Sequence, residues 1–275
     1  MQKNFARYKV DPFSRVCRQY RYMKWALRLR IKQTFAREDN WIFSRTACLG
    51  NDSLALTKEY SLLFRMNLQK ARSDLLIRKP DSLKKLSPLI IQKFISRGDI
   101  TPHIWAQSNR QFQKMPRPLF IVIDSYSDLT DVEFFHQATG SSFFCHKSDL
   151  FQLDEGEINL SIRGLLNLDE VESLYRILIY SLRNLWGVNI KIFFIHYPTK
   201  LEVRDLYLTR AKIIEKAVDN LANLDKYLYP IKIPEALVHP EIFPNGEIST
   251  FPYHYSLESK TFIAAELSKI MNCGF

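Results

Sequence analysis

Residues 116–128 read Pro116-Arg-Pro-Leu-Phe-Ile-Val-Ile-Asp-Ser-Tyr-Ser-Asp128 and contain the clearest strand signal in the chain. The residues from Leu119 to Ile123 are apolar and mostly β-branched, with prolines before them and polar residues after them. A short run that is apolar on both faces is typical of a central parallel strand covered by helices. We therefore expect residues 119–123 to form a strand at the centre of a parallel sheet.

The rest of the C-terminal half alternates between helical and strand patterns. The expected elements are, in order, a helix over Val171–Leu185, a strand over Ile190–His196, a helix over Leu201–Leu224, a short strand over Tyr229–Ile233 and a last helix over Ser256–Met271. We expect Asp169 to cap the first of these helices, and Leu206 and Ile213 to be among the buried residues of the second. This order predicts a parallel sheet with helices on both faces. The predicted fold class is therefore α/β, a three-layer αβα arrangement with a mostly parallel sheet, in one domain over residues 1–275.

The N-terminal part of the chain holds most of the net charge. Residues 1–50 contain twelve Lys and Arg against three acids, so they supply +9 of the total of +10. Within this helical segment, Ser14–Phe35 places Val16, Tyr20, Met23, Leu27 and Ile31 at helical spacing, with basic residues on most other faces. This pattern predicts a basic amphipathic helix, which is either a solvated surface helix or a contact with anionic lipid head groups or nucleic acid.

Two further helices are expected before the central strand. Asn51, Asp52 and Ser53 are suitable N-caps for a helix that runs to about Arg78, and a shorter helix follows over Ser82–Ser96. The sequence Gly50-Asn-Asp-Ser53 is similar to an esterase block. Because it lies ahead of a predicted helix and not after a predicted strand, we interpret it as a helix cap.

Several classes of function are disfavoured by what the sequence lacks. The four cysteines, at positions 17, 48, 145 and 273, form no CxxC pair, so we expect no metal site and no cofactor. There is no GxxxxGK[ST] loop, no GxGxxG and no GxSxG. No apolar stretch is long enough to span a bilayer, and the N-terminus lacks the apolar region of a signal peptide. The expected location is the cytoplasm, with a peripheral membrane contact through the basic helix.

Candidate site residues follow from the predicted topology. Ligands of open parallel sheets bind beyond the carboxyl ends of the strands. That rule selects Asp124 and Ser125 after one strand and His196 after another, and the loop before the last helix adds His254. Each has a structural alternative, because an Asp often caps a turn and a lone His more often serves packing than catalysis.

The order of four short segments resembles SGNH-like (GDSL-type) hydrolase and acyltransferase domains of bacterial surface-polysaccharide loci. The segments are Asp11-Pro-Phe13, Ser44-Arg-Thr46, Ile123-Asp124 and Pro252-Tyr-His-Tyr255. The resemblance implies an acyl-ester hydrolase or O-acyltransferase that acts on a glycan or acyl-ester substrate. It also implies that His254 is catalytic and that Ser44, Arg45 and Asp124 contribute to substrate binding. The strand-end rule adds Ser125 and His196 to the expected substrate-binding residues.

The chain departs from this family at its N-terminus. The family's first strand ends in Gly-Ser-Cys, which carries the nucleophile, but the corresponding residues here are Asn4-Phe-Ala-Arg-Tyr-Lys-Val10. Phe251 also occupies the place of the Asp in the Asp-x-x-His spacing. We therefore expect a sheet that lacks its first strand and a protein that is truncated or inactive.

Two other functions stay open. One is a glycosyltransferase-like protein of the same pathways, which would need a nucleotide-sugar site that we cannot locate in the sequence. The other is a non-enzymatic module whose basic helix binds anionic membrane or nucleic acid. Nucleic acid is the disfavoured partner of the two.

Overall fold

The computed structural model describes residues 12–60, 63–78, 91, 94–107, 111–150 and 160–272. The larger of its two sheets is parallel throughout, with the strand order β2-β1-β3-β7-β8. Its strands are β1 (Trp41–Arg45), β2 (Phe64–Asn67), β3 (Phe120–Asp124), β7 (Ile192–Ile195) and β8 (Leu228–Ile231). Strands β1, β3 and β7 are buried along their whole length, as a central parallel strand with two covered faces requires.

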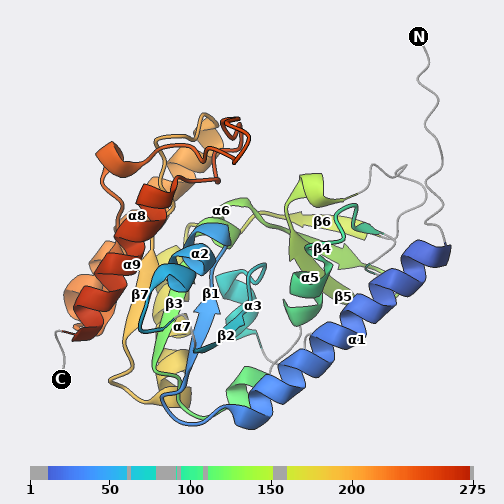
Figure 1. Cartoon of the computed structure of the whole chain (residues 1–275), viewed down its shortest axis with the longest axis horizontal. Helices are drawn as coiled ribbons and strands as arrows, with labels where there is room; N and C mark the ends of the chain where they lie inside the picture. The colour runs from blue at the N-terminus through green and yellow to red at the C-terminus, as the bar shows by residue number, and fades with distance from the viewer. Residues whose placement is uncertain are drawn as a thin grey trace.

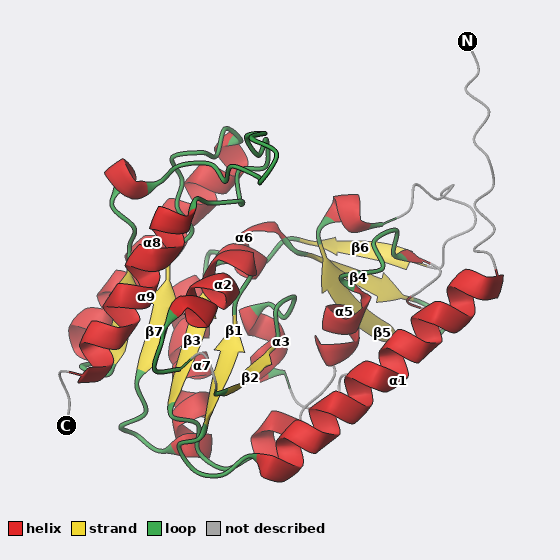
Figure 2. Cartoon of the chain, viewed as in Figure 1, coloured by secondary structure: helices red, strands yellow, loops and turns green. Residues whose placement is uncertain are grey.

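Helices cover both faces of this sheet, which confirms the predicted three-layer α/β architecture (Figures 1 and 2). On one face α2 (Cys48–Leu56) packs against α9 (Leu257–Asn272). On the other face α7 (Val171–Trp186) packs against α3 (Ser73–Ile77) and α8 (Asp205–Leu224). Short helices α5 (Thr101–Gln107) and α6 (Tyr126–Thr130) and 3₁₀ turns at Gln111–Lys114, Lys147–Asp149 and Glu235–Leu237 complete the connections.

A second, smaller sheet lies beside the first and was not predicted. It is antiparallel, with the order β5-β4-β6, and consists of β4 (Val132–His136), β5 (Ser141–Cys145) and β6 (Leu160–Gly164). One face of this sheet buries Phe134 and Phe143 in a separate apolar cluster with α5 (Figure 1). The aromatic and β-branched residues that pair across β4 and β5 favour strands over helices.

The segment between residues 51 and 78 is the main error of the sequence analysis. Instead of one long helix, it forms the second half of α2, the edge strand β2 and the short helix α3. Helix α2 ends at Leu56 because Thr57 is extended, with φ −70° and ψ 112°. Pairing of β2 with β1 over four residues outweighs the weak helical periodicity of this segment. The helix predicted over Ser82–Ser96 lies for the most part outside the described residues.

Strand β1, which leads into α2, was not predicted from the sequence. Strand β1 occupies the position between β2 and β3, and α2 follows it directly. The residues around Gly50 therefore lie after a strand and inside a helix, so their interpretation as a helix cap was wrong. The other boundary differences are small: Glu170 and not Asp169 is the N-cap of α7, and Leu206 and Ile213 of α8 are exposed.

The basic helix is confirmed as α1 (Pro12–Phe35), which runs along the outside of the molecule beside α5 (Figure 1). Its side chains are described at positions 17, 20, 23, 24, 26–31 and 33–35, so Val16 is outside this set. The described apolar members of its predicted stripe face solvent and not the core. No helix in the described part of the chain is long and apolar enough to cross a membrane.

Candidate functional site

A cavity of about 660 Å³ opens at the carboxyl edge of the parallel sheet. The turn after β1, the end of β3 and the residues after β7 contribute to its wall, and the loop before α9 closes the side opposite α5. Because β1, β3 and β7 are parallel, their carboxyl ends lie at one edge of the sheet, which is where ligands of this architecture bind. We take this cavity as the candidate site.

The turn between β1 and α2 is held in place by both neighbouring strands. From β3, the Asp124 carboxylate accepts the N–H of Ala47. From β2, Asn67 accepts the N–H of Thr46 at 3.0 Å and donates to the Thr46 carbonyl at 2.9 Å. Gly50 lets the first turn of α2 approach closely, because a Cβ there would lie 2.8 Å from Thr46 Cβ. The turn is thus rigidly positioned at the mouth of the cavity.

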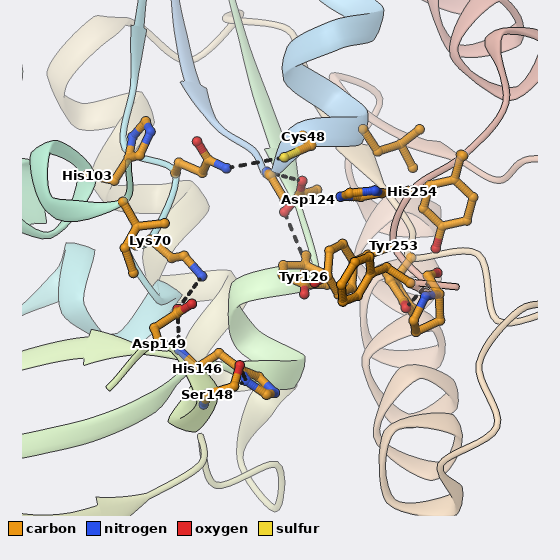
Figure 3. Close-up of a pocket in the computed structure, with 18 of the residues that line it drawn as sticks. Cys48, Lys70, His103, Asp124, Tyr126, His146, Ser148, Asp149, Tyr253 and His254 are labelled. Carbon is orange, nitrogen blue, oxygen red and sulfur yellow. Dashed lines mark hydrogen bonds and ion pairs between the residues drawn. The ribbon is translucent and has the colours of Figure 1, made fainter. Parts of the chain in front are cut away.

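Cys48 is the first residue of α2 and lines the cavity. Gln69 Nε2 donates to its Sγ at 3.7 Å (Figure 3). Surrounding protein atoms and the Asp52 carboxylate raise the pKa of the Cys48 thiol, and the Gln69 bond and the Lys70 charge lower it by less. The side chain is nevertheless exposed to solvent through the cavity. Cys48 is therefore an accessible thiol that needs a base to become a thiolate at neutral pH.

His254 stands on the facing wall of the cavity, in the loop before α9. Figure 3 shows its ring projecting toward the side that holds Cys48 and Asp124. Its Nδ1 is 3.7 Å from Glu241 Oε2, and its ring lies edge-on to Tyr253 at 4.9 Å between centroids. Burial lowers the pKa of His254 more than Glu241 raises it, so the imidazole is neutral at pH 7. A neutral imidazole can accept a proton, as a general base must.

Asp124 has a structural position as well as a place in the cavity wall. Its second carboxylate oxygen accepts the N–H of Tyr126 at 3.2 Å, so both oxygens hold backbone groups. Burial raises the pKa of Asp124 to about 7, although Arg45 and these two N–H bonds oppose the shift. Both oxygens of Asp124 already accept hydrogen bonds, one from the turn after β1 and one from α6. Asp124 therefore has a structural role in positioning these segments and is not free to act as a base.

Charged groups that pair with one another also line the cavity. Lys70 Nζ lies 3.4 Å from Asp131 and 3.2 Å from Asp149. Arg97 pairs with Asp99 at 2.6 Å. These groups can hydrogen-bond with a polar ligand, and each of the two cations is paired with at least one carboxylate of the protein.

The other predicted site residues lie close to the site, but their side chains have structural partners. Ser44 is buried in β1 and donates to the Met66 carbonyl at 3.4 Å, and Arg45 is buried beneath the turn in an ion pair with Asp128 at 3.0 Å.

Ser125 is buried and accepts the N–H of Tyr197 at 2.9 Å, which ties β3 to β7. His196 belongs to the cavity wall, and its ring packs against Phe194 at 5.2 Å between centroids. Its Nε2 is 3.9 Å from Asp219 of α8, which is beyond hydrogen-bond distance. Of the six predicted residues, Asp124, His196 and His254 line the cavity.

Sequence reasoning missed Cys48 and Gln69. The usable signal was the apolar triplet Trp41-Ile-Phe43, which is followed by a short polar turn and then by Cys48-Leu-Gly50. Read as a strand that leads into a helix, this pattern places the cysteine at the carboxyl edge of the sheet. Within the described ranges, no group of three or more His, Cys, Asp or Glu could hold a metal ion.

Comparison with protein-family models and with curated proteins finds no match to this chain. The chemistry of the site is therefore argued from its geometry.

Proposed function

We propose that this protein is an acyl-ester hydrolase or O-acyltransferase in which the Cys48 thiol is the nucleophile and the His254 imidazole is its base. The observation that carries the proposal is the position of Cys48. It begins the helix that follows a central parallel strand, and it faces a neutral histidine across a cavity. A nucleophile and a base from different segments that meet at such an edge are the elements of covalent acyl transfer.

The reaction divides into two balanced steps. His254 takes the proton of the Cys48 thiol while the sulfur attacks the carbonyl carbon of the ester. The imidazolium then returns this proton to the leaving alkoxide, and a thioester remains on Cys48. In the second step His254 removes a proton from water or from an acceptor hydroxyl, which attacks the thioester and regenerates the thiol.

The negative oxygen that forms during the attack needs hydrogen-bond donors. Gln69 is the nearest side-chain candidate, since its amide already donates to Cys48 Sγ. The first turn of α2 is the second candidate, because no described side chain caps it and its N–H groups point toward the helix start. Donors of this kind typically contribute about 10²–10³ in rate.

The cavity wall supports a substrate with both apolar and polar parts. Tyr126, Phe251 and Tyr253 form an aromatic wall near the thiol, where Tyr126 and Tyr253 lie 5.7 Å apart between ring centroids. Lys70 and Asp149 lie on the other side of the cavity (Figure 3). We propose an acyl group on the aromatic side and a hydroxyl-rich glycan as donor or acceptor, in agreement with the family resemblance.

The test is hydrolysis of a panel of p-nitrophenyl acyl esters by the purified full chain. Cys48→Ala should lower kcat/KM by about 10³ or more, and His254→Gln by about 10²–10⁴. Cys17→Ala, in α1, is the matched control and should leave the rate unchanged. The rate should also rise with pH through an apparent pKa below about 6.5, because burial lowers the pKa of His254. Full activity of the Cys48→Ala variant would rule out this mechanism.

A further inference from the structure

Helix α1 is strongly basic, and its own sequence contains no acidic residue. Its 24 residues include seven Lys and Arg and no Asp or Glu. A surface helix that serves only solubility usually mixes both signs, since pairs at i and i+4 stabilise it. The one-sided charge of α1 therefore points to an anionic partner.

The same helix exposes a continuous apolar stripe. Tyr20, Met23, Leu27 and Ile31 follow one another at intervals of three or four residues, and between 48% and 64% of each side chain is exposed. The side of the helix that contacts the rest of the protein includes Leu29, which packs on the core. Amphipathic helices normally turn their apolar face toward the core of the protein. Because the apolar stripe of α1 faces solvent instead, it can bind an apolar surface outside the protein.

Basic side chains flank this stripe on both sides. At about 100° per residue, Lys24 and Arg30 lie about 60° to either side of Leu27, and Arg28 lies beyond Lys24. All three basic residues are exposed. An apolar strip bordered by cations matches the boundary of an anionic bilayer, where acyl chains lie beneath a layer of phosphates.

We propose that α1 is an interfacial helix that docks this protein on an anionic lipid surface. The stripe enters the acyl boundary, and the flanking Lys and Arg contact lipid phosphates. Nucleic acid fits less well because its backbone would face four apolar side chains. A second copy of the chain also fits less well, because two such helices packed face to face would bring fourteen like charges together.

The proposal is independent of the acyl-transfer chemistry. The stripe residues do not line the cavity, so hydrolysis of soluble esters should not change when α1 is altered. Ester hydrolysis without vesicle binding would therefore count against the docking proposal alone, and vesicle binding without ester hydrolysis would count against the acyl-transfer proposal alone.

Vesicle co-sedimentation tests the docking with the full chain. The vesicles contain either phosphatidylcholine alone or equal parts of phosphatidylcholine and phosphatidylglycerol. We expect tight binding to the anionic vesicles only, with a marked loss at high salt. Met23→Ser combined with Leu27→Ser should weaken binding by about tenfold per side chain, and Lys24→Gln combined with Arg28→Gln by about fivefold per charge.

Val188→Ser combined with Leu224→Ser is the matched control, since both residues are exposed and lie outside α1. Thermal melting of each variant verifies that it is folded. Binding that is equal on neutral vesicles, or equal for the stripe variant and the control, would overturn the proposal. So would binding to an oligonucleotide but not to vesicles, or a dimer in solution that the stripe substitutions dissociate.

Discussion

Replacement of Arg45 by Met should destabilise the fold severely without any direct effect on substrate contacts. The guanidinium is fully buried and lies 3.0 Å from Asp128 Oδ2, which is fully buried as well. It also donates to the Asp124 carbonyl at 2.6 Å and to the Ala71 carbonyl at 3.3 Å. Arg45 thus joins the end of β1 to the ends of the neighbouring segments beneath the candidate site.

The size of the effect follows from what the substitution leaves behind. Removing one partner of a buried ion pair costs about 3–5 kcal/mol, because the other charge stays in the interior. Here Asp128 keeps donors from Ser73, at 2.7 Å from both its N–H and its hydroxyl, and from Tyr175 at 3.0 Å. These donors limit the penalty on the carboxylate, but two carbonyls also lose their donor. We therefore expect a loss of about 4 kcal/mol, a large fraction of a typical stability.

Urea denaturation followed by tryptophan fluorescence measures this loss, and a double-mutant cycle attributes it. Asp128→Asn removes the charge while it retains a side chain that can hydrogen-bond with Ser73 and Tyr175. Arg45→Met combined with Asp128→Asn should be more stable than the sum of the single losses predicts, by about 1 kcal/mol or more. Additive losses would refute the ion-pair reasoning. A higher KM with unchanged stability for Arg45→Met would instead restore its predicted role in substrate binding.

Three further substitutions have definite expected outcomes. Gly50→Ala should cost about 1–3 kcal/mol, because its Cβ would lie 2.8 Å from Thr46, and an unchanged melting temperature would contradict that close approach. Burial lowers the pKa of His196 to about 4 in the folded protein, whereas the unfolded chain has the ordinary pKa of about 6.5. Between these two pH values the unfolded chain binds a proton that the folded protein does not bind, so the free energy of unfolding of the wild type falls as pH drops from about 6.5 toward 4. His196→Gln should therefore gain stability relative to the wild type between pH 7 and about pH 5 in urea titrations, and a constant difference would be evidence against this linkage. Asp124→Asn should lower the free energy of unfolding by about 1–3 kcal/mol and should also lower kcat/KM, because an amide nitrogen cannot accept the N–H of Ala47. Equal stability of this variant and the wild type would show that the bond is dispensable.

The parts of the fold that were predictable are those in which local pattern and tertiary environment agree. Strand β3 is apolar on both faces because helices cover both faces, and α7 and α9 have enough turns for their periodicity to be unambiguous. Strand β1 was missed because Ser44 and Arg45 are polar, although both are buried. Their burial depends on partners such as Asp128 that are distant in sequence, and no local pattern reveals such partners.

The residues of the candidate site were predictable only where the elements next to them were predicted correctly. Asp124 and His254 could be selected because they follow, or precede, elements that were predicted correctly. Cys48 could not be selected, since its position matters only once β1 is recognised as a strand and α2 as the helix after it. The failure to recognise β1 and the start of α2 therefore hid the residue on which the proposed chemistry depends.

Trapping the acylated protein tests directly whether Cys48 is the nucleophile. The full chain is mixed with an excess of an activated acyl ester, quenched in acid and analysed by intact-mass spectrometry and peptide mapping. The proposal predicts a mass increase of one acyl group, located on Cys48, that is absent from Cys48→Ala and retained in Cys17→Ala. An acyl group on a different residue, or ester turnover by Cys48→Ala at the wild-type rate, would contradict the assignment of Cys48 as the nucleophile.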